Sequence, residues 1–217
     1  MKILITGTSK GIGKAIAEKF INEGHFVIGF DILAATINNP NYKHYVIDVR
    51  NKDSFPEIDG LNIIINNAGV QTNTVEDINV NLIGTINITE KYAFQENIKS
   101  VLNIASPSGV NGSEFPYYAS SKGGVIAYTK NTALTIAKFG ATCNALSPGG
   151  VITSSNNHIL NDKKLYQQVL NETLLNKWMD TEEIAEFAYF MTVINKSMTG
   201  ENIIVDNGEL LKSNFIW

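Results

Sequence analysis

Thr6-Gly7-Thr8-Ser9-Lys10-Gly11-Ile12-Gly13 is a glycine-rich stretch that directly follows a short apolar run at residues 3–5. The apolar side chains of Ile12, Ile16 and Phe20 then recur at intervals of four, which predicts one buried face of a helix. Glycine permits a tight turn and lets the backbone approach a bound group closely, while the N–H groups that begin a helix attract anions. A plain glycine turn shares this pattern, but a strand, this turn and a helix in that order favour a site for the pyrophosphate of a dinucleotide.

The alternation of apolar runs and helical segments continues along the rest of the chain. Runs that predict strands lie at residues 3–5, 26–30, 45–49, 63–65, 101–104, 142–146 and 202–205. Segments with helical periodicity lie at residues 77–95, 117–139, 162–175 and 182–191. Continuous apolar strands between helices indicate an α/β fold, a doubly wound parallel sheet of the Rossmann type with helices on both faces. No linker or repeat interrupts the pattern, so we predict one domain over residues 1–217 that binds its ligands beyond the carboxyl ends of the strands.

The composition narrows the class of protein. Hydrophobic residues make up 44% of the chain and charged residues 18%, which is ordinary for a globular protein. A net charge of -4 argues against binding to nucleic acid. No apolar stretch approaches the roughly 18 residues of a membrane helix, and the N-terminus lacks the pattern of a secretory signal. The single cysteine, Cys143, suits a reducing compartment, so we expect a cytoplasmic protein that acts on neither nucleic acid nor membrane.

Two charged residues near the glycine-rich turn predict different cofactors. Asp31 ends the second apolar run, 18 positions after Gly13, near the spacing at which a carboxylate binds the ribose hydroxyls of NAD. That carboxylate would repel the 2′-phosphate of NADP, whereas Lys10 would attract it. We expect NAD to be favoured, because a carboxylate at a strand end is held in place and a lysine side chain can swing away. NADP stays possible through Lys10.

A second group of residues predicts acid–base chemistry. Tyr118 and Lys122 stand four residues apart, which places them on one face of a helix with Cβ atoms about 5–6 Å apart. A nearby lysine cation favours the phenolate and so lowers the pKa of a phenol, ordinarily about 10. Ser106 follows the strand at 101–104 and could donate a hydrogen bond to a substrate oxygen that Tyr118 protonates. Ser108 competes with Ser106 for this role.

With these motifs in place, the chain resembles the short-chain dehydrogenase/reductase family, in its common single-domain branch, over nearly its whole length. The segments that carry the resemblance stand in the family's order: the turn at 6–13, Asn66-Asn67-Ala68-Gly69, Asn79-Val80-Asn81-Leu82-Ile83-Gly84, Ser106, Tyr118 with Lys122, Asn144-Ala145-Leu146-Ser147-Pro148-Gly149 and Thr199-Gly200-Glu201. The resemblance implies an NAD(P)-dependent oxidoreductase that moves a hydride between nicotinamide and a small alcohol or ketone.

The resemblance also implies roles for individual residues, and no metal ligand among them. Tyr118 would be the general acid/base, and Lys122 would tune it and bind the nicotinamide ribose. Ser106 would polarise the substrate carbonyl, while Asn81 would bend its helix and hold a water that links Lys122 to solvent. Asp48 would approach the adenine, and residues 148–153 would hold the nicotinamide amide. The implied cofactor-binding set is Gly7, Ser9, Lys10, Gly11, Ile12, Gly13, Asp31, Asp48, Val49, Asn67, Ala68, Gly69, Tyr118, Lys122, Pro148, Gly149, Val151 and Thr153.

The chain is shorter than most members of that branch. The interval from Asp31 to Asp48 leaves room for a helix of only a turn or two, and Pro56 allows at most a brief helix before the next strand. The largest cut lies between Gly69 and Asn81, where members carry a longer loop beside the substrate cleft. We therefore expect an open substrate site.

The segment after Thr153 is expected to form a lid over the substrate. His158, Tyr166 and Trp178 could contact the substrate or only pack, and packing is favoured for Trp178. No pair of basic residues marks a site for a phosphate or an acyl carrier, so the sequence does not define the substrate.

Two other functions fit parts of the sequence. The chain could be a catalytically silent NAD(P)-binding module that acts through a protein partner, although the complete set of Asn81, Ser106, Tyr118 and Lys122 argues against this. A structural component of an oligomer would leave the segment 148–153 unexplained. The family resemblance also implies a homodimer or homotetramer that pairs through the helices at 77–95 and 117–139.

Overall fold

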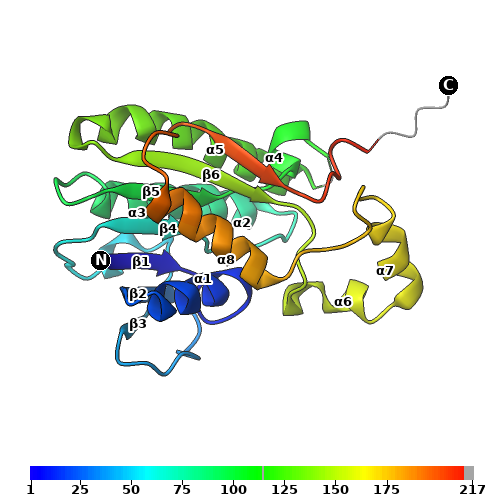
Figure 1. The fold of residues 1–217 in the computed structure, drawn as a ribbon, viewed down its shortest axis with the longest axis horizontal. Coiled ribbons are helices and arrows are strands. Elements are labelled where there is room, and N and C mark those ends of the chain that lie inside the picture. Colours follow the sequence, from blue (N-terminus) through cyan, green and yellow to red (C-terminus); the bar gives the residue numbers. More distant parts are fainter. Residues whose placement is uncertain (114, 213–217) are drawn as a thin grey trace.

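The computed structural model describes residues 1–113 and 115–212, so the last five residues of the predicted domain lie outside the described part. One parallel sheet of seven strands occupies its centre (Figure 1). The strands are β1 (Lys2–Thr6), β2 (Phe26–Asp31), β3 (Tyr42–Val46), β4 (Ile63–Asn66), β5 (Ser100–Ile104), β6 (Thr142–Pro148) and β7 (Asn202–Val205). Their order is β3-β2-β1-β4-β5-β6-β7, so the winding reverses between β1 and β4 and leaves a crevice at their carboxyl ends. The predicted doubly wound α/β fold is confirmed.

Helices cover both faces of this sheet (Figure 1). The long helices α1 (Gly11–Asn22) and α8 (Thr181–Tyr189) pack on one face, and α3 (Gly84–Tyr92) and α5 (Pro116–Ile136) pack on the other. The shorter elements are α2 (Val75–Asp77), α4 (Ser108–Asn111), α6 (Asn157–Leu160), α7 (Lys163–Leu170), the 3-10 turns at Lys52–Ser54, Ala137–Phe139 and Ser154–Asn156, and the π-helical turns at Ile78–Ile83 and Phe190–Ile194. Within the described residues, no helix is long and apolar enough to cross a membrane.

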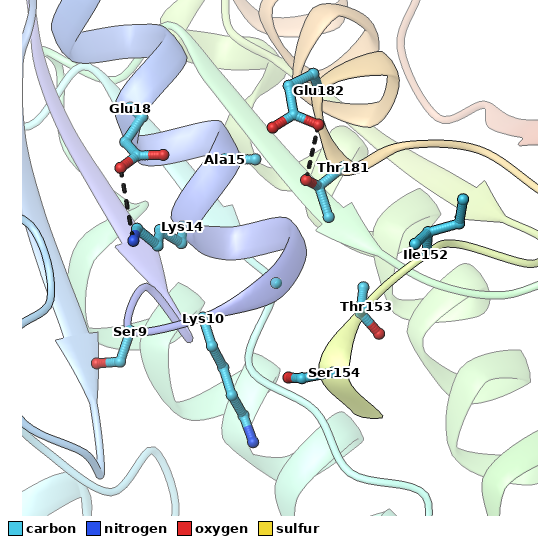
Figure 2. Close-up of a pocket in the computed structure, with 11 residues that line it drawn as sticks. Ser9, Lys10, Lys14, Ala15, Glu18, Ile152, Thr153, Ser154, Thr181 and Glu182 are labelled. Atoms are coloured by element: carbon cyan, nitrogen blue, oxygen red, sulfur yellow. Dashed lines mark hydrogen bonds and ion pairs between the residues drawn. The ribbon is translucent and has the colours of Figure 1, made fainter. Parts of the chain in front are cut away.

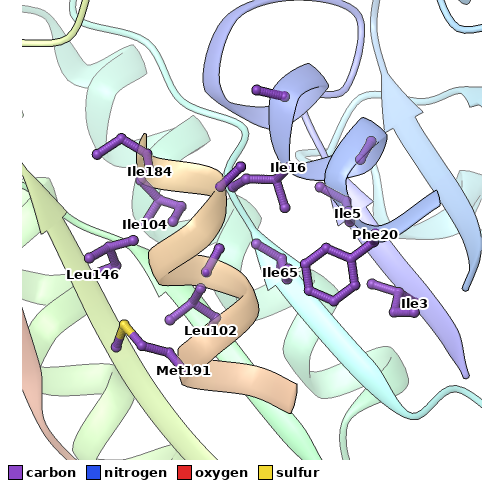
Figure 3. Packing of buried hydrophobic residues seen from close by; sticks show 14 of the residues in the cluster. Ile3, Ile5, Ile16, Phe20, Ile65, Leu102, Ile104, Leu146, Ile184 and Met191 are labelled. Atoms are coloured by element: carbon purple, nitrogen blue, oxygen red, sulfur yellow. The ribbon is translucent and has the colours of Figure 1, made fainter. Parts of the chain in front are cut away.

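The core explains why the strands are continuous apolar runs. Ile3 and Ile5 of β1 enter the core under α1 and α8, while Leu4 between them enters the core under α3 and α5. All three side chains are fully buried. Figure 3 shows Phe20 of α1 and Ile184 of α8 closing the first of these cores. Each such side chain contributes about 1.5–3 kcal/mol by burial, which fixes the sheet that carries the site.

The predicted position of the third strand was wrong by about three residues. The apolar run at 45–49 suggested a strand there, but β3 pairs with β2 from Tyr42 to Val46. After Val46 the chain leaves the sheet, and the Ile47 amide donates to the Asp31 carbonyl at 2.8 Å. Ile47 and Val49 still bury their side chains in the core from a loop. Burial alone therefore does not locate the end of an edge strand.

Two helix predictions also needed correction. No helix lies between Asp31 and Tyr42, where a turn or two was expected; side-chain hydrogen bonds hold this segment as a loop. The helix predicted at 162–175 ends at Leu170, because the Thr173 hydroxyl donates to the Leu170 carbonyl at 2.9 Å and the chain then turns. The brief helix expected near Pro56 is the 3-10 turn at Lys52–Ser54.

Candidate active site

The glycine-rich turn is built so closely that two of its glycines admit no side chain. Gly7 has φ +76°, and a Cβ atom there would lie 2.7 Å from Nδ2 of Asn67. A Cβ on Gly13 would lie 2.1 Å from the Gly7 carbonyl oxygen. Asn67 donates from Nδ2 to the carbonyls of Thr6 and Gly7 at 2.9 and 3.2 Å, which ties the turn to the end of β4. The turn therefore owes its shape to β4 as well as to its own glycines.

The start of α1 fits the diphosphate of a dinucleotide. Lys10 is the N-cap residue, and its side chain makes no capping hydrogen bond, so the first N–H groups of α1 remain available to an anion. Gly11 follows at φ +56° and faces the Thr153 methyl group. Figure 2 shows Lys10 extending beside Ser154 at a cavity of about 420 Å³ between the starts of α1 and α8. These residues would hold phosphate oxygens by backbone hydrogen bonds and a nearby cation.

Asp31 lies at the end of β2, and backbone N–H groups orient its carboxylate. Oδ2 accepts from the Ser9 amide and Oδ1 from the Leu33 amide, both at 2.9 Å. One contact comes from the glycine-rich turn and the other from the loop after β2. The half-buried carboxylate is thus fixed beside the turn, where a ribose would meet it, and each oxygen keeps a further lone pair for a hydroxyl.

Asp48 and Val49 lie in the loop after β3 and line neither of the two cavities beside the glycine-rich turn. The Asp48 carboxylate accepts from the Arg50 side chain at 2.6–3.0 Å, and Arg50 also binds Glu76 at 2.5 Å. These hydrogen bonds hold the pKa of the Asp48 carboxyl below its usual range. Val49 is buried against Gly84. The arginine pairing was not predicted from the sequence.

A cleft of about 910 Å³ joins the turn to the predicted catalytic residues. Its lining includes Lys10 and Ile12 of the turn together with Ser106, Tyr118 and Lys122. Acidic Glu172 and Glu209 also line the cleft, and Lys10 and Lys122 are the only lysines or arginines among its described lining residues. Among the implied cofactor residues, the cleft is lined by Lys10, Ile12, Asn67, Gly69, Tyr118, Lys122, Pro148, Gly149, Val151 and Thr153. Gly7, Gly13 and Ala68 support the turn, and Ser9 and Gly11 line the smaller cavity. Asp31 lines neither cavity but accepts from the Ser9 amide.

Lys122 is a buried cation placed against Tyr118. Only 5% of it is exposed, and Nζ donates to the Ile104 carbonyl at 2.8 Å. Nζ lies 5.7 Å from the centre of the Tyr118 ring. Burial lowers the pKa of the Lys122 ammonium to about 8, and the charge of Asp77 opposes that shift. The four-residue spacing on α5 thus brings the phenol and the ammonium together as predicted.

Ser106 and Ser108 both reach the cleft, so the structure does not separate the two hydroxyls by position. Their oxygens are 3.3 Å apart, and the Ser108 amide donates to the Ser106 hydroxyl at 3.2 Å. Ser106 lies two residues after β5, next to Ala105, whose amide still donates to the Leu146 carbonyl of β6, whereas Ser108 begins the short helix α4. This tether to the sheet favours Ser106 over Ser108.

Asn81 lies where the helical segment between β4 and β5 departs from α geometry. The π-helical turn at Ile78–Ile83 contains it. Its amide pairs with both backbone groups of Val70 at 2.8 and 2.9 Å and donates to the Ser121 hydroxyl at 3.0 Å. A Cβ on Gly69 would lie 3.1 Å from Asn81 Oδ1 and 3.6 Å from Lys122 Nζ. Asn81 therefore joins the loop after β4 to α5.

The segment after β6 lines the same cleft as Tyr118. Val151 bridges to Met179 in a parallel arrangement, which holds residues 150–152 against the chain that enters α8. Trp178 lies over Gly150, whose Cβ would be 2.2 Å from the indole Nε1. Trp178 also packs edge-on against Tyr166, 6.0 Å between ring centres, and lines the cleft. Trp178 thus both packs against Tyr166 and lines the cleft, and His158 lines the cleft as well.

Three supporting residues were missed from the sequence. The Thr6 hydroxyl accepts from the amides of Asn67 and Ala68 at 3.0 and 2.9 Å. Asp77 is fully buried, and its carboxylate accepts from both backbone N–H groups of residues 72 and 73. Ser121 connects Asn81 to the Tyr118 carbonyl. Their only sequence signal is a small polar or acidic residue within an apolar or helical stretch, which is common in any fold.

Comparisons with known proteins agree with this geometry. A family model described as enoyl-(acyl carrier protein) reductase matches residues 7–209. The 3-oxoacyl-[acyl-carrier-protein] reductase of Thermotoga maritima is 30% identical, over 94% of this chain and 96% of its own. Among solved structures, ligand-free aldohexose dehydrogenase of Thermoplasma acidophilum superposes with a TM-score of 0.88 at 25% identity, covering 100% of this chain and 96% of its own.

A putative 2-deoxy-D-gluconate 3-dehydrogenase of Agrobacterium tumefaciens with bound NADP superposes equally well, with a TM-score of 0.88 at 27% identity over 97% of this chain and 96% of its own. The family match extends over more than nine-tenths of the residues and includes both the glycines of the turn and all of α5. The chain therefore belongs to the short-chain dehydrogenase/reductase family and is an NAD(P)-dependent oxidoreductase that acts on CH–OH and C=O groups.

Proposed function

We propose that the chain interconverts a small alcohol and its ketone with Tyr118 as the general acid/base and NAD as the favoured cofactor. The observation that carries this proposal is the buried Lys122 ammonium, 5.7 Å from the Tyr118 ring in a cleft that also contains Ser106. A buried cation needs a partner, and a phenolate in contact with it is stabilised. The site thus favours proton exchange at the Tyr118 oxygen near neutral pH.

Each side chain has a distinct task in this reaction. The nicotinamide, when bound along residues 148–153, supplies or accepts the hydride. In the direction of reduction, Ser106 donates a hydrogen bond to the substrate carbonyl oxygen, and Tyr118 gives that oxygen its proton. Lys122 stabilises the phenolate that remains and binds the nicotinamide ribose. Asn81 fixes the loop beside Lys122 and holds a water through which the proton is replaced.

The preference for NAD is supported by the position of Asp31. Its carboxylate is fixed by the amides of Ser9 and Leu33, so it cannot turn away from a 2′-phosphate. The exposed Lys10 side chain has no comparable restraint. Asp48 and Val49 complete the adenosine side in this proposal, and Arg50 orients the Asp48 carboxylate.

Asp31→Asn is expected to weaken the discrimination between NADH and NADPH by about tenfold or more. The amide keeps the approximate shape of the carboxylate but removes the charge that repels a 2′-phosphate. Titration of the purified protein with each reduced cofactor, followed by nicotinamide fluorescence, measures the ratio of dissociation constants. Asp53→Asn, an exposed carboxylate far from the turn, is the matched control. An unchanged ratio in Asp31→Asn would make Lys10 the selecting residue, and binding of neither cofactor would contradict the proposed function.

The second candidate, a silent cofactor-binding module, predicts binding without turnover. The four residues proposed for catalysis lie together in or beside one cleft, which favours the enzyme. A screen of ketones with NADH and alcohols with NAD tests this point directly. Turnover of any of these compounds that is lost in Tyr118→Phe excludes the silent module.

We expect a homodimer or homotetramer that pairs through α3 and α5, in a cytoplasmic setting that suits the free, buried Cys143. On α5, the Leu134 side chain is 80% exposed, and Phe94 just after α3 is also exposed. Analytical ultracentrifugation at micromolar concentration is expected to show the assembly, and Leu134→Glu is expected to shift it toward the monomer. A parent protein that sediments as a monomer would contradict this expectation.

A further inference from the structure

A chain of three side chains connects the glycine-rich turn to the edge strand β3. The Thr8 hydroxyl lies 2.8 Å from the Tyr42 hydroxyl, and that hydroxyl lies 2.8 Å from Nδ1 of His44. Nε2 of His44 lies 2.9 Å from the Leu33 carbonyl oxygen, in the loop after β2. Thr8 is fully buried and Tyr42 and His44 are half-buried, so water competes little at the inner end of this chain.

The donors and acceptors fix one direction for these bonds in the neutral imidazole. Since a carbonyl only accepts, Nε2 of His44 carries the proton and donates to Leu33. Nδ1 is then an acceptor and accepts a hydrogen bond from the Tyr42 hydroxyl, whose oxygen accepts from Thr8. Tyr42 and His44 therefore each have a partner on both sides, and Thr8 donates at the inner end of the chain.

The backbone of β2 leaves room for this chain only because residue 29 is glycine. A Cβ atom on Gly29 would lie 2.1 Å from the Tyr42 hydroxyl oxygen and 2.4 Å from the Thr8 hydroxyl oxygen. Both hydroxyls thus occupy the space over β2 that a side chain at position 29 would fill. Gly29 is otherwise an unfavourable choice within a buried strand, since it packs nothing and costs conformational entropy.

The loop that His44 holds is also the loop that positions Asp31. The Leu33 amide donates to Asp31, while the Ser9 hydroxyl donates to the Ala34 carbonyl at 2.9 Å. The Thr36 hydroxyl adds a second hydrogen bond between the loop and the turn by donating to the Ser9 carbonyl at 2.8 Å. The loop after β2 contains no helix, so helical hydrogen bonds do not define its shape. Its shape depends on the turn on one side and on His44 on the other.

We propose that Tyr42 and His44 are positioning residues for the adenosine half of the cofactor. They act through Thr8 and Leu33, which set the glycine-rich turn and the loop around Asp31. The inference rests on the proposed function, because that function places the adenosine ribose at Asp31. Neither residue lines the cleft beside Tyr118, so the chemical step itself does not depend on them.

Tyr42→Phe removes the central hydroxyl and is expected to raise the dissociation constants of NADH and of ADP-ribose together, each by about tenfold. ADP-ribose contains the adenosine, the pyrophosphate and a second ribose but no nicotinamide, so it reports the adenosine end of the site. The KM for the cofactor should rise by a similar factor, with kcat at saturating cofactor unchanged. Tyr45→Phe is the matched control, because Tyr45 lies on the same strand and packs its ring against Phe30.

His44→Leu is the second variant and leaves the bond between Thr8 and Tyr42 in place. It is expected to weaken ADP-ribose binding by a few fold, and it decides the question if Tyr42→Phe yields no folded protein. Parent-like ADP-ribose affinity in a folded Tyr42→Phe or His44→Leu variant would overturn this inference and leave the proposed function standing. An equal loss of ADP-ribose affinity in Tyr45→Phe would do the same. A parent protein that binds neither ADP-ribose nor NADH would overturn the proposed function, and the inference with it.

Discussion

Tyr118→Phe is expected to lower kcat by about 10³-fold while the dissociation constant for NADH changes by less than about twofold. A positioned general acid contributes about 10²–10⁴-fold to a rate, and this substitution removes only the oxygen that carries the proton. The ring that packs near Lys122 remains, so the cofactor end of the cleft keeps its walls. Steady-state kinetics on the best ketone found by screening, together with a fluorescence titration of NADH, measures both quantities.

Tyr117→Phe is the control for this experiment. Tyr117 carries the same hydroxyl one residue earlier on α5, but it is exposed and does not line the cleft. Its substitution should leave kcat within twofold of the parent. If Tyr118→Phe turned over like the parent, the role of general acid would pass to another group. If Tyr118→Phe also lost NADH binding, the main role of Tyr118 would be to bind the cofactor.

Lys122→Met is expected to abolish most turnover, by about 100-fold or more, and at the same time to make the protein more stable at pH 7. Burial raises the free energy of the charged ammonium relative to the neutral amine, which lowers the pKa of Lys122 from 10.5 to about 8. At 1.36 kcal/mol per pKa unit, relief of that cost is worth about 1–3 kcal/mol after the lost bond to Ile104 is allowed for. Urea unfolding compared with Lys130→Met, an exposed lysine on the same helix, measures the gain.

The pH dependence of this gain has a definite sign. Below pH 8 the ammonium is charged in both the folded and the unfolded chain, so the full cost is present. Between pH 8 and 10.5 the unfolded chain binds more protons than the folded chain, and the stability of the parent rises with pH. The advantage of Lys122→Met should therefore be smaller at pH 9.5 than at pH 7. A gain that grew with pH, or a loss of stability at pH 7, would contradict this account of Lys122.

The parts of the fold that local patterns determine were predictable from the sequence. The glycines that mark the turn are close together in the chain, and the spacing of Tyr118 and Lys122 depends only on helix geometry. The strands at the centre of the sheet are buried on both faces, so their apolar runs are continuous and easy to recognise.

The parts that depend on distant contacts were not predictable. The strand β3 lies at the edge of the sheet, and its limits are set by pairing with β2 rather than by its own apolar residues. The loop after Asp31 is held by hydrogen bonds to Ser9 and His44, and no local pattern indicates those partners. The same holds for Asp77, whose carboxylate serves a neighbouring loop and also influences Lys122 from within the protein. A sequence shows the residue type at such positions, whereas the partner comes from the fold.

The indole of Trp178, seated on Gly150 in the wall of the cleft, gives the protein an optical reporter of its own. The chain has only two tryptophans, and the emission of an indole overlaps the absorption of a reduced nicotinamide. In the proposed site the nicotinamide binds along residues 148–153, so energy transfer from Trp178 would report its arrival there. Time-resolved tryptophan emission can then follow the nicotinamide end of the cofactor as it settles into the site, without any added label.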